Sequence, residues 1–487
     1  MQPFSDVMID QLRAMVGTGA VSTDPAELSS RTRDCWPRLT MRERAGEELP
    51  QPGAVVWPAD TAQTAALFAW ATANQVAVVP YGGGGGVTGG ASPLAGCLML
   101  DTKRMIEIGP LDEISGLVTC GPGVIGQRLE EWLGARGWTL GHFPSSITVS
   151  SVGGFAASRS AGQASTKYGK FEDMVAGLEA VLPDGTVVRC LPQPASAAGP
   201  DLAQLLMGGE GTLGVITSVD LRIHPLPEVM DFRAYRLPSF IAGLEAIRQV
   251  LRKDLRPAVV RLYDEADTGL NHPEMGGGCL VVTVCEGYAP LVAVEREALT
   301  QAMVAQGGED MGEDAARHWH AHRYDVSYRL AEFMKPGGAF GDALALDTCE
   351  VAGPWSMLPQ LYDAVKAALG TAMDLVMCHA SHAYRDGAAL YFTFGAVGAG
   401  DEEAARQRYD AAWAAAMQAA LALGATTTHH HGVGLLRAPY LATELGEGGM
   451  ALLRRIKAAV DPSGIANPGK LGLAPPDDRT AGQESAS

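Results

Sequence analysis

Two short stretches of this chain carry residue types whose spacing could do chemistry. The first, Pro80 to Gly90, places seven glycines in eleven residues directly after the apolar run Val76–Val79. Such a density brings main-chain N–H groups close to a ligand, and phosphate is the ligand that they favour. Neither a Gly-Lys-Ser/Thr ending nor an acidic residue at the Rossmann spacing follows the run. The stretch therefore predicts a diphosphate cradle, with a flexible linker as the alternative.

The second stretch, Thr426 to Gly434, contains His429, His430 and His431. On an extended segment neighbouring side chains point to opposite faces, so we expect at most two of the three imidazoles to share one centre. A metal site would also need His379 and His382, but their spacing on a strand predicts opposite faces, and no Asp or Glu stands beside them as a ligand. We predict no metal, and leave open that the histidines are solvated or bonded in the core.

The composition limits the classes of protein that are compatible with the chain. With 487 residues, of which 47% are hydrophobic, it is too long for one ordinary core, so we expect two domains. The net charge of -18 and the pI of about 5.0 argue against nucleic acid and against a polybasic grip on anionic lipid. The eight cysteines are scattered singly without a CxxC pair, which is typical of buried thiols in a reducing compartment. With no signal-peptide pattern and no run of roughly 18 apolar residues, we predict a cytoplasmic protein.

Hydrophobic periodicity predicts the elements that position the glycine run. A strand over 54–58, a helix over 61–75 that begins after Asp60, and the strand into the glycine run form a strand-helix-strand unit. Two further stretches rich in glycine or hydroxyl residues, 144–162 and 208–223, are also expected at strand ends. Three such loops converge on one long ligand better than any one of them alone.

A different rhythm follows over residues 230–425, where the order strand-helix-strand-strand-helix occurs twice. This pattern predicts an antiparallel sheet backed by helices, in a separate cap domain. We expect the segment after it to return to the first domain and the last residues to be disordered. The predicted division is an N-terminal segment 1–48, a first domain 49–229, a cap domain 230–425, a returning segment 426–475 and a tail 476–487.

The order of PYGGGGG, SSVGGFAASRSAG, GGEGTLGVIT and DPSGIANPGKLG resembles the FAD-binding domain of the vanillyl-alcohol oxidase and p-cresol methylhydroxylase (PCMH) superfamily, from about residue 50 to 473. The resemblance implies an α+β fold with a two-subdomain PCMH-type FAD-binding domain and a cap domain. It also implies FAD held by these loops, without a covalent bond because the first loop has no histidine or cysteine. The residues implied to bind FAD are Pro80, Tyr81, Gly82, Gly83, Gly84, Gly85, Gly86, Val87, Ser145, Ser146, Thr148, Ser150, Ser151, Gly153, Gly154, Ser158, Arg159, Ser160, Ala161, Glu210, Gly211, Thr212, Gly214, Val215 and Ile216.

Within the superfamily, CHASHAYRDGAALYFTF and HHHGVG resemble the alkyldihydroxyacetonephosphate synthase branch. The D-2-hydroxyacid dehydrogenase branch carries a metal-binding GHxGDGNxH and a later EHG instead. The resemblance implies that Tyr391 and the three adjacent histidines sit at the flavin, and PAVVRLYD implies a functional arginine at Arg261. An aromatic packed on a sheet and a structural ion pair remain the alternatives for Tyr391 and Arg261.

One position departs from that branch. Its substrate-binding arginine is expected near residues 335–336, where this chain has Lys335 and Pro336. A lysine meets a phosphate as a point charge without the bidentate fork of an arginine. Lys335 and His382 are the residues that we expect to bind substrate.

The resemblance implies a redox-neutral exchange of the acyl group of acyl-dihydroxyacetone phosphate for a fatty alcohol, through flavin N5. The alternatives are an oxidoreductase that takes hydride from a D-2-hydroxyacid or other alcohol, and a flavin-binding module without catalysis. We expect a small-molecule or lipid-like substrate, peripheral membrane contact, no nucleic acid, and a homodimer. In AALYFTFGA, alternation predicts Tyr391 and Thr393 on the flavin side of the sheet, with Leu390, Phe392 and Phe394 facing the helices.

Overall fold

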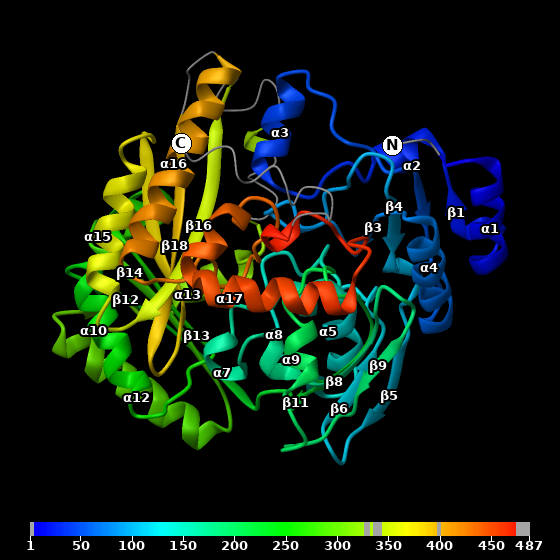
Figure 1. Ribbon diagram of the computed structural model, residues 1–487. Helices are drawn as coiled ribbons and strands as arrows, with labels where there is room; N and C mark the ends of the chain where they lie inside the picture. Colours follow the sequence, from blue (N-terminus) through cyan, green and yellow to red (C-terminus); the bar gives the residue numbers. More distant parts are fainter. Residues whose placement is uncertain (1–3, 326–331, 335–342, 397–400, 474–487) are drawn as a thin grey trace.

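The computed structural model describes residues 4–325, 332–334, 343–396 and 401–473 (Figure 1). Two regions lie side by side in it, one containing a four-stranded and a five-stranded sheet and the other built on a seven-stranded sheet. Helices and antiparallel sheets occur in both regions, which confirms the predicted α+β class.

The first sheet has the order β1-β2-β4-β3 and is parallel except at β1. Its strands are β1 Val21–Ser22, β2 Ala54–Val56, β3 Val78–Tyr81 and β4 Leu98–Asp101. Between β2 and β3 runs α4 (Thr61–Asn74), which begins after Asp60, whose carboxylate accepts a hydrogen bond from the Gln63 N–H at 2.8 Å. Leu67 and Phe68 of α4 are buried against the sheet. The predicted strand-helix-strand unit is therefore confirmed.

A second, five-stranded sheet is antiparallel, in the order β5-β6-β10-β8-β9. Its strands are β5 Ile108–Asp112, β6 Leu117–Cys120, β8 Val175–Val181, β9 Val187–Cys190 and β10 Val215–Arg222, and β7 Trp138–Thr139 pairs separately with β11 His224–Pro225. The helices of this part are α5 Gly126–Gly134, α6 Val152–Ser158, α7 Ser165–Tyr168, α8 Phe171–Met174 and α9 Leu202–Leu206. One hydrophobic cluster joins the sheet to α5, α6 and α8, and this fixes the loop before α6 against the glycine run.

The seven-stranded sheet has the order β15-β12-β14-β13-β17-β18-β16, and all its pairings are antiparallel. Its strands are β12 Val229–Leu237, β13 Val259–Tyr263, β14 Cys279–Gly287, β15 Glu309–Asp310, β16 Ala345–Pro354, β17 Leu375–Ala383 and β18 Gly387–Ala396. The helices are α10 Phe240–Leu251, α11 Glu265–Asn271, α12 Ala289–Ala305, α13 Asp314–His322, α15 Leu358–Leu369 and α16 Glu402–Ala422.

Helices α10, α12, α15 and α16 cover one face of this sheet, on the outer side of the molecule in Figure 1. Leu390, Phe392 and Phe394 of β18 are fully buried in the hydrophobic cluster under them. Because strand residues alternate, Tyr391 and Thr393 lie on the other face, as predicted. That face is turned toward the two smaller sheets.

Both ends of the described chain cross between the regions. Near the N-terminus, after α1 (Asp6–Val16) and α2 (Pro25–Ser29), α3 (Pro37–Arg44) lies against α16. There the Trp36 indole N–H donates to the Tyr409 hydroxyl at 3.0 Å. After α17 (Ala438–Val460), which Gly446 interrupts, the chain returns to the first sheet, where Val78 pairs with Ala466.

The eight cysteines are all free, and six of them are buried as predicted, whereas Cys35 is exposed and Cys190 is half-buried. Among the described residues, the helices are all too short or too polar to cross a membrane.

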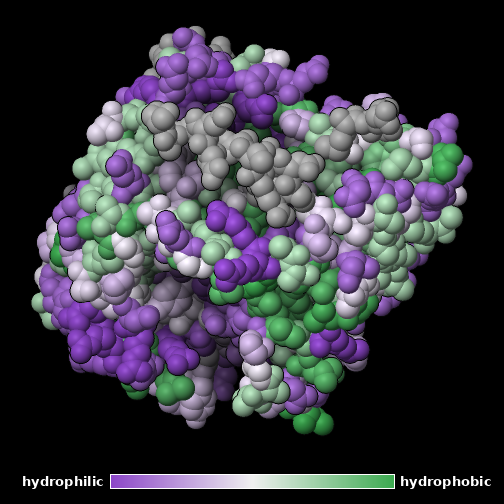
Figure 2. Space-filling model, in the orientation of Figure 1, coloured by the Kyte–Doolittle hydropathy of each residue, from purple (hydrophilic) through white to green (hydrophobic). Residues whose placement is uncertain are grey.

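Hydrophilic side chains dominate the lower left of the face in Figure 2, over the seven-stranded sheet region, and apolar side chains gather at the lower right. Exposed apolar residues of the second sheet region include Val187, Leu191, Leu202 and Leu205.

Candidate active site

The glycine run lies directly against the loop that precedes α6. A Cβ added at Gly83 would lie 1.7 Å from the Val149 carbonyl oxygen, and one at Gly82 would lie 2.3 Å from the Ser151 Oγ. Gly84 has a φ of +68°, which L side chains rarely adopt. Glycines are required here because two backbones touch. A flexible linker does not fit this packing.

Main-chain donors are exposed to a ligand in the same place. Within the described part of the chain, no main-chain carbonyl in a loop or turn accepts a hydrogen bond from the N–H groups of Gly82 to Val87. The Ser150 and Ser146 hydroxyls lie beside this loop and bond to each other at 2.9 Å. A row of amide donors with hydroxyls beside it suits the oxygens of a diphosphate, so this part of the chain fits the diphosphate of FAD.

The third predicted loop and the returning C-terminal segment meet the glycine run. The carboxylate of Glu210 accepts from the N–H groups of Val433 at 2.5 Å and Gly434 at 2.7 Å. The Asn467 amide donates to the carbonyl oxygens of Gly90 and Glu210 at 3.0 and 2.6 Å. Burial raises the pKa of Glu210 to about 7. The three predicted loops thus lie together, and the segment that carries the histidines is tied to them.

Several residues predicted to bind FAD have their side chains engaged within the protein. The Arg159 guanidinium donates to the carbonyl oxygens of Gln204 and Met207, at 2.6 and 3.1 Å. The side chains of Val215 and Ile216 lie in two hydrophobic clusters. Only the main chain of these two residues is left to touch a cofactor.

The remaining predicted FAD residues fall into two groups. Pro80 and Tyr81 belong to β3, Gly85, Gly86 and Val87 to the glycine run, and Ser145, Thr148, Gly153, Gly154, Ser160 and Ala161 to the loop before α6, to α6 itself or to the loop after it. Ser158 belongs to α6, and Gly211, Thr212 and Gly214 belong to the loop before β10. The Ser158 and Thr212 hydroxyls donate to the carbonyls of Gly154 and Gly209, and a Cβ at Gly211 would lie 2.7 Å from Pro80 of β3. Lys335 and Pro336 lie outside the described residues.

On the other side of the site, His379 and His382 both lie on the Tyr391 face of the seven-stranded sheet. The pairing of β17 with β18 shifts between Ala380 and His382, so that His379 is opposite Tyr391 and His382 is opposite Ala389. This bulge adds one residue to β17 and turns His382 to the face of His379. The prediction that the two histidines face opposite sides was therefore wrong.

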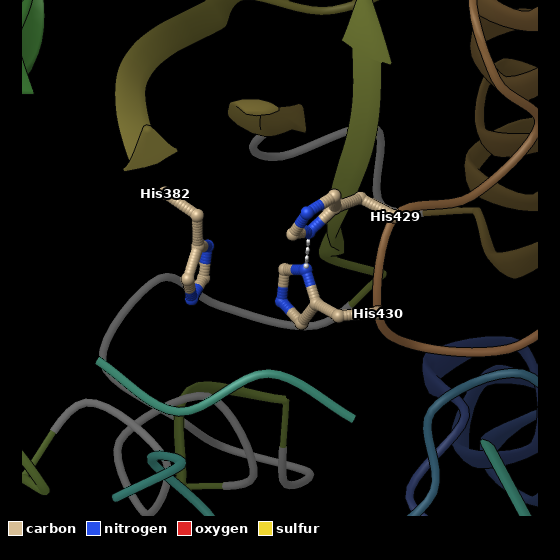
Figure 3. A group of neighbouring side chains, drawn as sticks. All are labelled: His382, His429 and His430. Carbon is tan, nitrogen blue, oxygen red and sulfur yellow. Dashed lines mark hydrogen bonds between the residues drawn. The ribbon is translucent and has the colours of Figure 1, made fainter. Parts of the chain in front are cut away.

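His382, His429 and His430 form a histidine cluster, and their rings converge in Figure 3. The His382 ring centre is 5.2 Å from that of His429 and 4.9 Å from that of His430. The Nδ1 atoms of His429 and His430 lie 2.9 Å apart. The buried Nε2 of His382 has no hydrogen-bond partner among the described residues, so one ring nitrogen is available to a ligand.

Tyr391 stands next to this cluster. Its ring stacks on that of His379 at 4.8 Å, and the rings of His430 and His431 lie 5.9 and 5.5 Å away. The hydroxyl donates to Thr348 Oγ1 at 2.9 Å, and burial raises the pKa of Tyr391 to about 12. The phenol is therefore protonated at neutral pH.

Arg261 of β13 reaches the same group through His379. Its Nη2 is 2.6 Å from His379 Nε2, and its guanidinium lies 5.7 Å from the centre of the Trp319 ring. On the far side of the ring, His379 Nδ1 is 3.4 Å from Asp267. Arg261, His379, Tyr391 and the histidine cluster thus form one continuous group.

The run of three histidines is bent, so the expectation of an extended segment was wrong. Its main chain curls around Glu350 of β16, which sequence reasoning missed. The sequence signal was a strand in which two acidic residues, Asp347 and Glu350, stand among apolar ones. Tyr384, also missed, has its hydroxyl 2.9 Å from His429 Nε2. The prediction that no Asp or Glu lies beside His379 and His382 was wrong for His379, whose Nδ1 is 3.4 Å from Asp267.

Burial keeps the histidines neutral. It lowers the pKa of His429 to about 3, with Lys170 adding to the effect, and it lowers the pKa of His382 and His430 well below the usual range. A neutral imidazole has one donor and one acceptor nitrogen. In this neutral form the group can orient a polar substrate by donating and accepting hydrogen bonds.

His382, His429 and His430 could also hold a metal ion, because one nitrogen from each ring lies within 4.8 Å of the others. Neutral imidazole nitrogen is a common metal ligand. The absence of a metal remains a prediction, which chelation tests.

Comparisons with known proteins agree with this architecture. The family model "FAD binding domain" matches residues 52–191, and "FAD linked oxidases, C-terminal domain" matches residues 226–471. Alkyldihydroxyacetonephosphate synthase of Trypanosoma brucei brucei is 30% identical, over 98% of this chain and 82% of that protein. The uncharacterized FAD-linked oxidoreductase YgcU of Escherichia coli (strain K12) is 32% identical, over 95% of this chain and 98% of that protein.

Among solved structures, an alkyldihydroxyacetonephosphate synthase superposes with a TM-score of 0.81 at 22% identity, over 96% of this chain and 87% of that one. p-Cresol methylhydroxylase superposes with a TM-score of 0.78 at 17% identity, over 96% of both chains. These likenesses confirm the predicted PCMH-type fold. FAD is the cofactor, and non-covalent binding is consistent with the family. The chain belongs to the family of FAD linked oxidases and is an FAD-dependent enzyme.

Proposed function

We propose that this enzyme exchanges the acyl group of acyl-dihydroxyacetone phosphate for a fatty alcohol, a step of ether-lipid synthesis. In the balanced reaction, the bond from C1 to the acyl oxygen breaks, a bond from C1 to the alcohol oxygen forms, and the alcohol proton leaves with the fatty acid. The carrying observation is the group of neutral, buried titratable side chains around Tyr391. By resemblance, the sequence strings that carry this group replace the metal-binding pattern of the hydroxyacid dehydrogenase branch.

FAD, when bound, supplies the covalent flavin chemistry of the exchange. The protein must move protons at the substrate, and Tyr391 Oη and the ring nitrogens of His430 and His431 are the groups that we assign to this task. Arg261, held by His379, supplies a fixed positive charge for a substrate oxygen. The free Nε2 of His382 is the nitrogen that we assign to substrate binding.

An apolar cavity supports a lipid-like substrate. It has a volume of about 220 Å³ and lies between the two regions, with Phe143 and Gln163 on one wall and Val259, Val284 and Trp319 on the other. Trp319 also contacts the Arg261 guanidinium. A substrate with an acidic head at Arg261 and an apolar chain at Trp319 would use both features.

The second candidate is an oxidoreductase that removes hydride from a D-2-hydroxyacid or another alcohol. It is favoured by the names of two relatives, the oxidoreductase of Escherichia coli and glycolate oxidase subunit GlcD of Bacillus subtilis, the latter 29% identical over 86% of this chain. Both candidates use the same cofactor and differ in whether the flavin becomes reduced.

Anaerobic mixing separates the two candidates. The FAD-loaded enzyme is mixed with a panel of D-2-hydroxyacids, and in parallel with acyl-dihydroxyacetone phosphate and a labelled long-chain alcohol. We expect the flavin absorption to stay oxidised throughout and labelled ether product to form in the second mixture. Rapid bleaching by any hydroxyacid, with no ether product, would establish the oxidoreductase instead.

We also propose the domain boundaries given above, a homodimer, a cytoplasmic location and peripheral membrane contact to reach a lipid-like substrate. The exposed apolar residues of β9 and α9 support such a contact. Lys335 is proposed to meet the substrate phosphate. Light scattering of the purified enzyme and flotation with neutral lipid vesicles test the dimer and the contact.

A further inference from the structure

Glu350 contacts the main chain of all three adjacent histidines, and its side chain is shielded from solvent. It belongs to β16, where it is paired with Tyr391 of β18, and it is fully buried. Its neighbours Cys349 and Val351 are in the hydrophobic cluster under α15 and α16. Because strand residues alternate, Glu350 shares the face of Tyr391.

One oxygen of Glu350 accepts hydrogen bonds from the main chain of the histidine run. Its Oε1 accepts from the N–H groups of His429, His430 and His431, at 3.2, 3.2 and 2.9 Å. The Thr428 hydroxyl also donates to this oxygen, at 2.7 Å. Successive amides can point at one atom only where the chain bends around it. The bend directs the imidazoles toward Tyr391 and His382 instead of alternating faces.

The charge of this carboxylate is held by Arg437, which is also fully buried. Arg437 Nη1 donates to Glu350 Oε1 at 2.8 Å and its Nη2 donates to Oε2. Burial alone would raise the pKa of Glu350, but Arg437 and then His431 hold that pKa well below its usual range. The carboxylate is therefore a permanent acceptor.

The second oxygen faces a ring. His431 Nδ1 lies 3.0 Å from Glu350 Oε2, so the carboxylate favours a proton at Nδ1. The same ring has its centre 5.5 Å from that of the Tyr391 ring. Glu350 therefore lies where it can orient the imidazole that is next to the phenol.

We propose that Glu350 is a positioning residue for the proton-transfer group. It bends the histidine run into the site and holds a proton at Nδ1 of His431. This inference rests on the proposed function, in which Tyr391 and the histidines move protons at the substrate.

Glu350→Gln tests the inference, with Asp347→Asn as the matched control. Asp347 is equally buried on the same strand, but it lies on the opposite face, where it accepts from Trp413 Nε1 at 3.0 Å and from the Tyr409 hydroxyl. Both substitutions remove one buried carboxylate from β16. Only the first one touches the histidine run.

The readouts are the ¹⁵N signals of labelled histidines in the FAD-loaded enzyme, the flavin absorption spectrum, and turnover as a function of pH. For Glu350→Gln we expect loss of the Nδ1–H signal pattern of His431, an altered flavin spectrum, and turnover lower by about 10²-fold. Asp347→Asn should keep the histidine signals and the shape of the pH profile. Unchanged histidine signals in Glu350→Gln, with stability reduced as in the control, would overturn the inference.

Glu350→Asp serves as the conservative variant. It also replaces Glu350→Gln in the test if Glu350→Gln fails to bind FAD. Its shorter carboxylate keeps the charge but cannot reach every donor, so we expect a partial return of the His431 signal and of turnover. Histidine signals and turnover equal to wild type would contradict the positioning role. Changed histidine signals without any effect on exchange activity would leave Glu350 as the organiser of the loop and would instead remove the histidines from the proposed reaction.

Discussion

The site has two walls that present different chemical groups to a ligand, main-chain N–H groups on one wall and side chains on the other. The wall around the glycine run presents main-chain N–H groups, held in place because two backbones touch at Gly83 and Val149. The wall around Tyr391 presents side chains from β13, β16, β17, β18 and the bent histidine run. A main-chain site needs the right local sequence, and a side-chain site needs the right register between distant strands.

This difference explains the tolerance that each wall should show. In the glycine run, a methyl group at Gly83 would meet the Val149 backbone, and one at Gly82 or Gly85 would meet a serine hydroxyl, so this wall is sensitive to size. Around Tyr391, the removal of one side-chain oxygen keeps the packing but removes a group that can donate or accept a proton. Substitutions on the two walls should therefore separate flavin content from turnover.

The largest effect on flavin content is expected for Gly83→Ala. Its Cβ would meet the Val149 carbonyl oxygen at 1.7 Å, so one of the two loops must move. We expect FAD affinity to fall at least roughly tenfold, because about 1.4 kcal/mol of strain in the bound loop is enough for that loss. The ratio of flavin to protein after gel filtration and an FAD titration measure it.

Gly134→Ala is the control, since nothing lies within 4 Å of the added methyl group on α5. It should keep the flavin, and the better helix propensity of alanine should raise stability slightly. Equal flavin content in both variants would mean that the glycine run is not a tight contact.

The second effect concerns turnover at constant flavin content. Tyr391→Phe removes one oxygen from the proton-transfer group, and we expect turnover to fall by roughly 10²-fold or more with FAD retained. Tyr235→Phe is the matched control. Tyr235 lies in the same sheet but away from the site, and its hydroxyl also pairs with a threonine, Thr300 Oγ1 at 2.8 Å. Comparable turnover in the two variants would show that the Tyr391 hydroxyl only fills space.

A third prediction uses acid to test the buried His142, whose ring packs against Phe155 of α6. Burial lowers the pKa of His142, beside α6, to about 3, so the folded protein binds fewer protons than the unfolded chain between pH 6.5 and 3. Stability from this group is complete above pH 6.5 and is lost as the pH falls through that window. Relative to His142→Phe, the wild type should lose about 2 kcal/mol between pH 7 and pH 5. Urea unfolding at the two pH values measures this difference, and an equal loss in both proteins would contradict a neutral His142.

The smallest effect is expected from chelation. If the histidine cluster acts as neutral imidazoles, extended dialysis against EDTA should leave turnover and the flavin spectrum unchanged. Tight binding of Zn²⁺ or Mn²⁺ to the dialysed enzyme, with recovery of lost activity, would instead assign the cluster to a metal.

The sequence was informative wherever the cause of a structure is local. Asp60 caps α4 as its position predicts, and Asp184-Gly185 turns β8 into β9, with Gly185 at a φ of +88°. The face of Tyr391 followed from alternation along one strand. Each of these features depends on residues a few positions apart.

The errors arose where the cause is distant. Whether β17 carries a bulge depends on its pairing with β18, and this decided the face of His382. The bend of the histidine run depends on Glu350, which lies on another strand. Periodicity contains no information about either contact, so the side-chain wall could be proposed by resemblance but not built from the sequence.

The return of the chain to the first sheet bears on how the protein is made. The Val78 N–H donates to the Ile465 carbonyl at 2.8 Å, and the Asn467 N–H donates to the Val78 carbonyl at 2.9 Å. On a ribosome, β3 emerges long before residue 465, so the nascent sheet waits with an open edge through most of translation. Open strand edges are sites of intermolecular pairing. We therefore expect nascent chains that stall within the seven-stranded sheet to depend on chaperones, even though the glycine run is already complete in them.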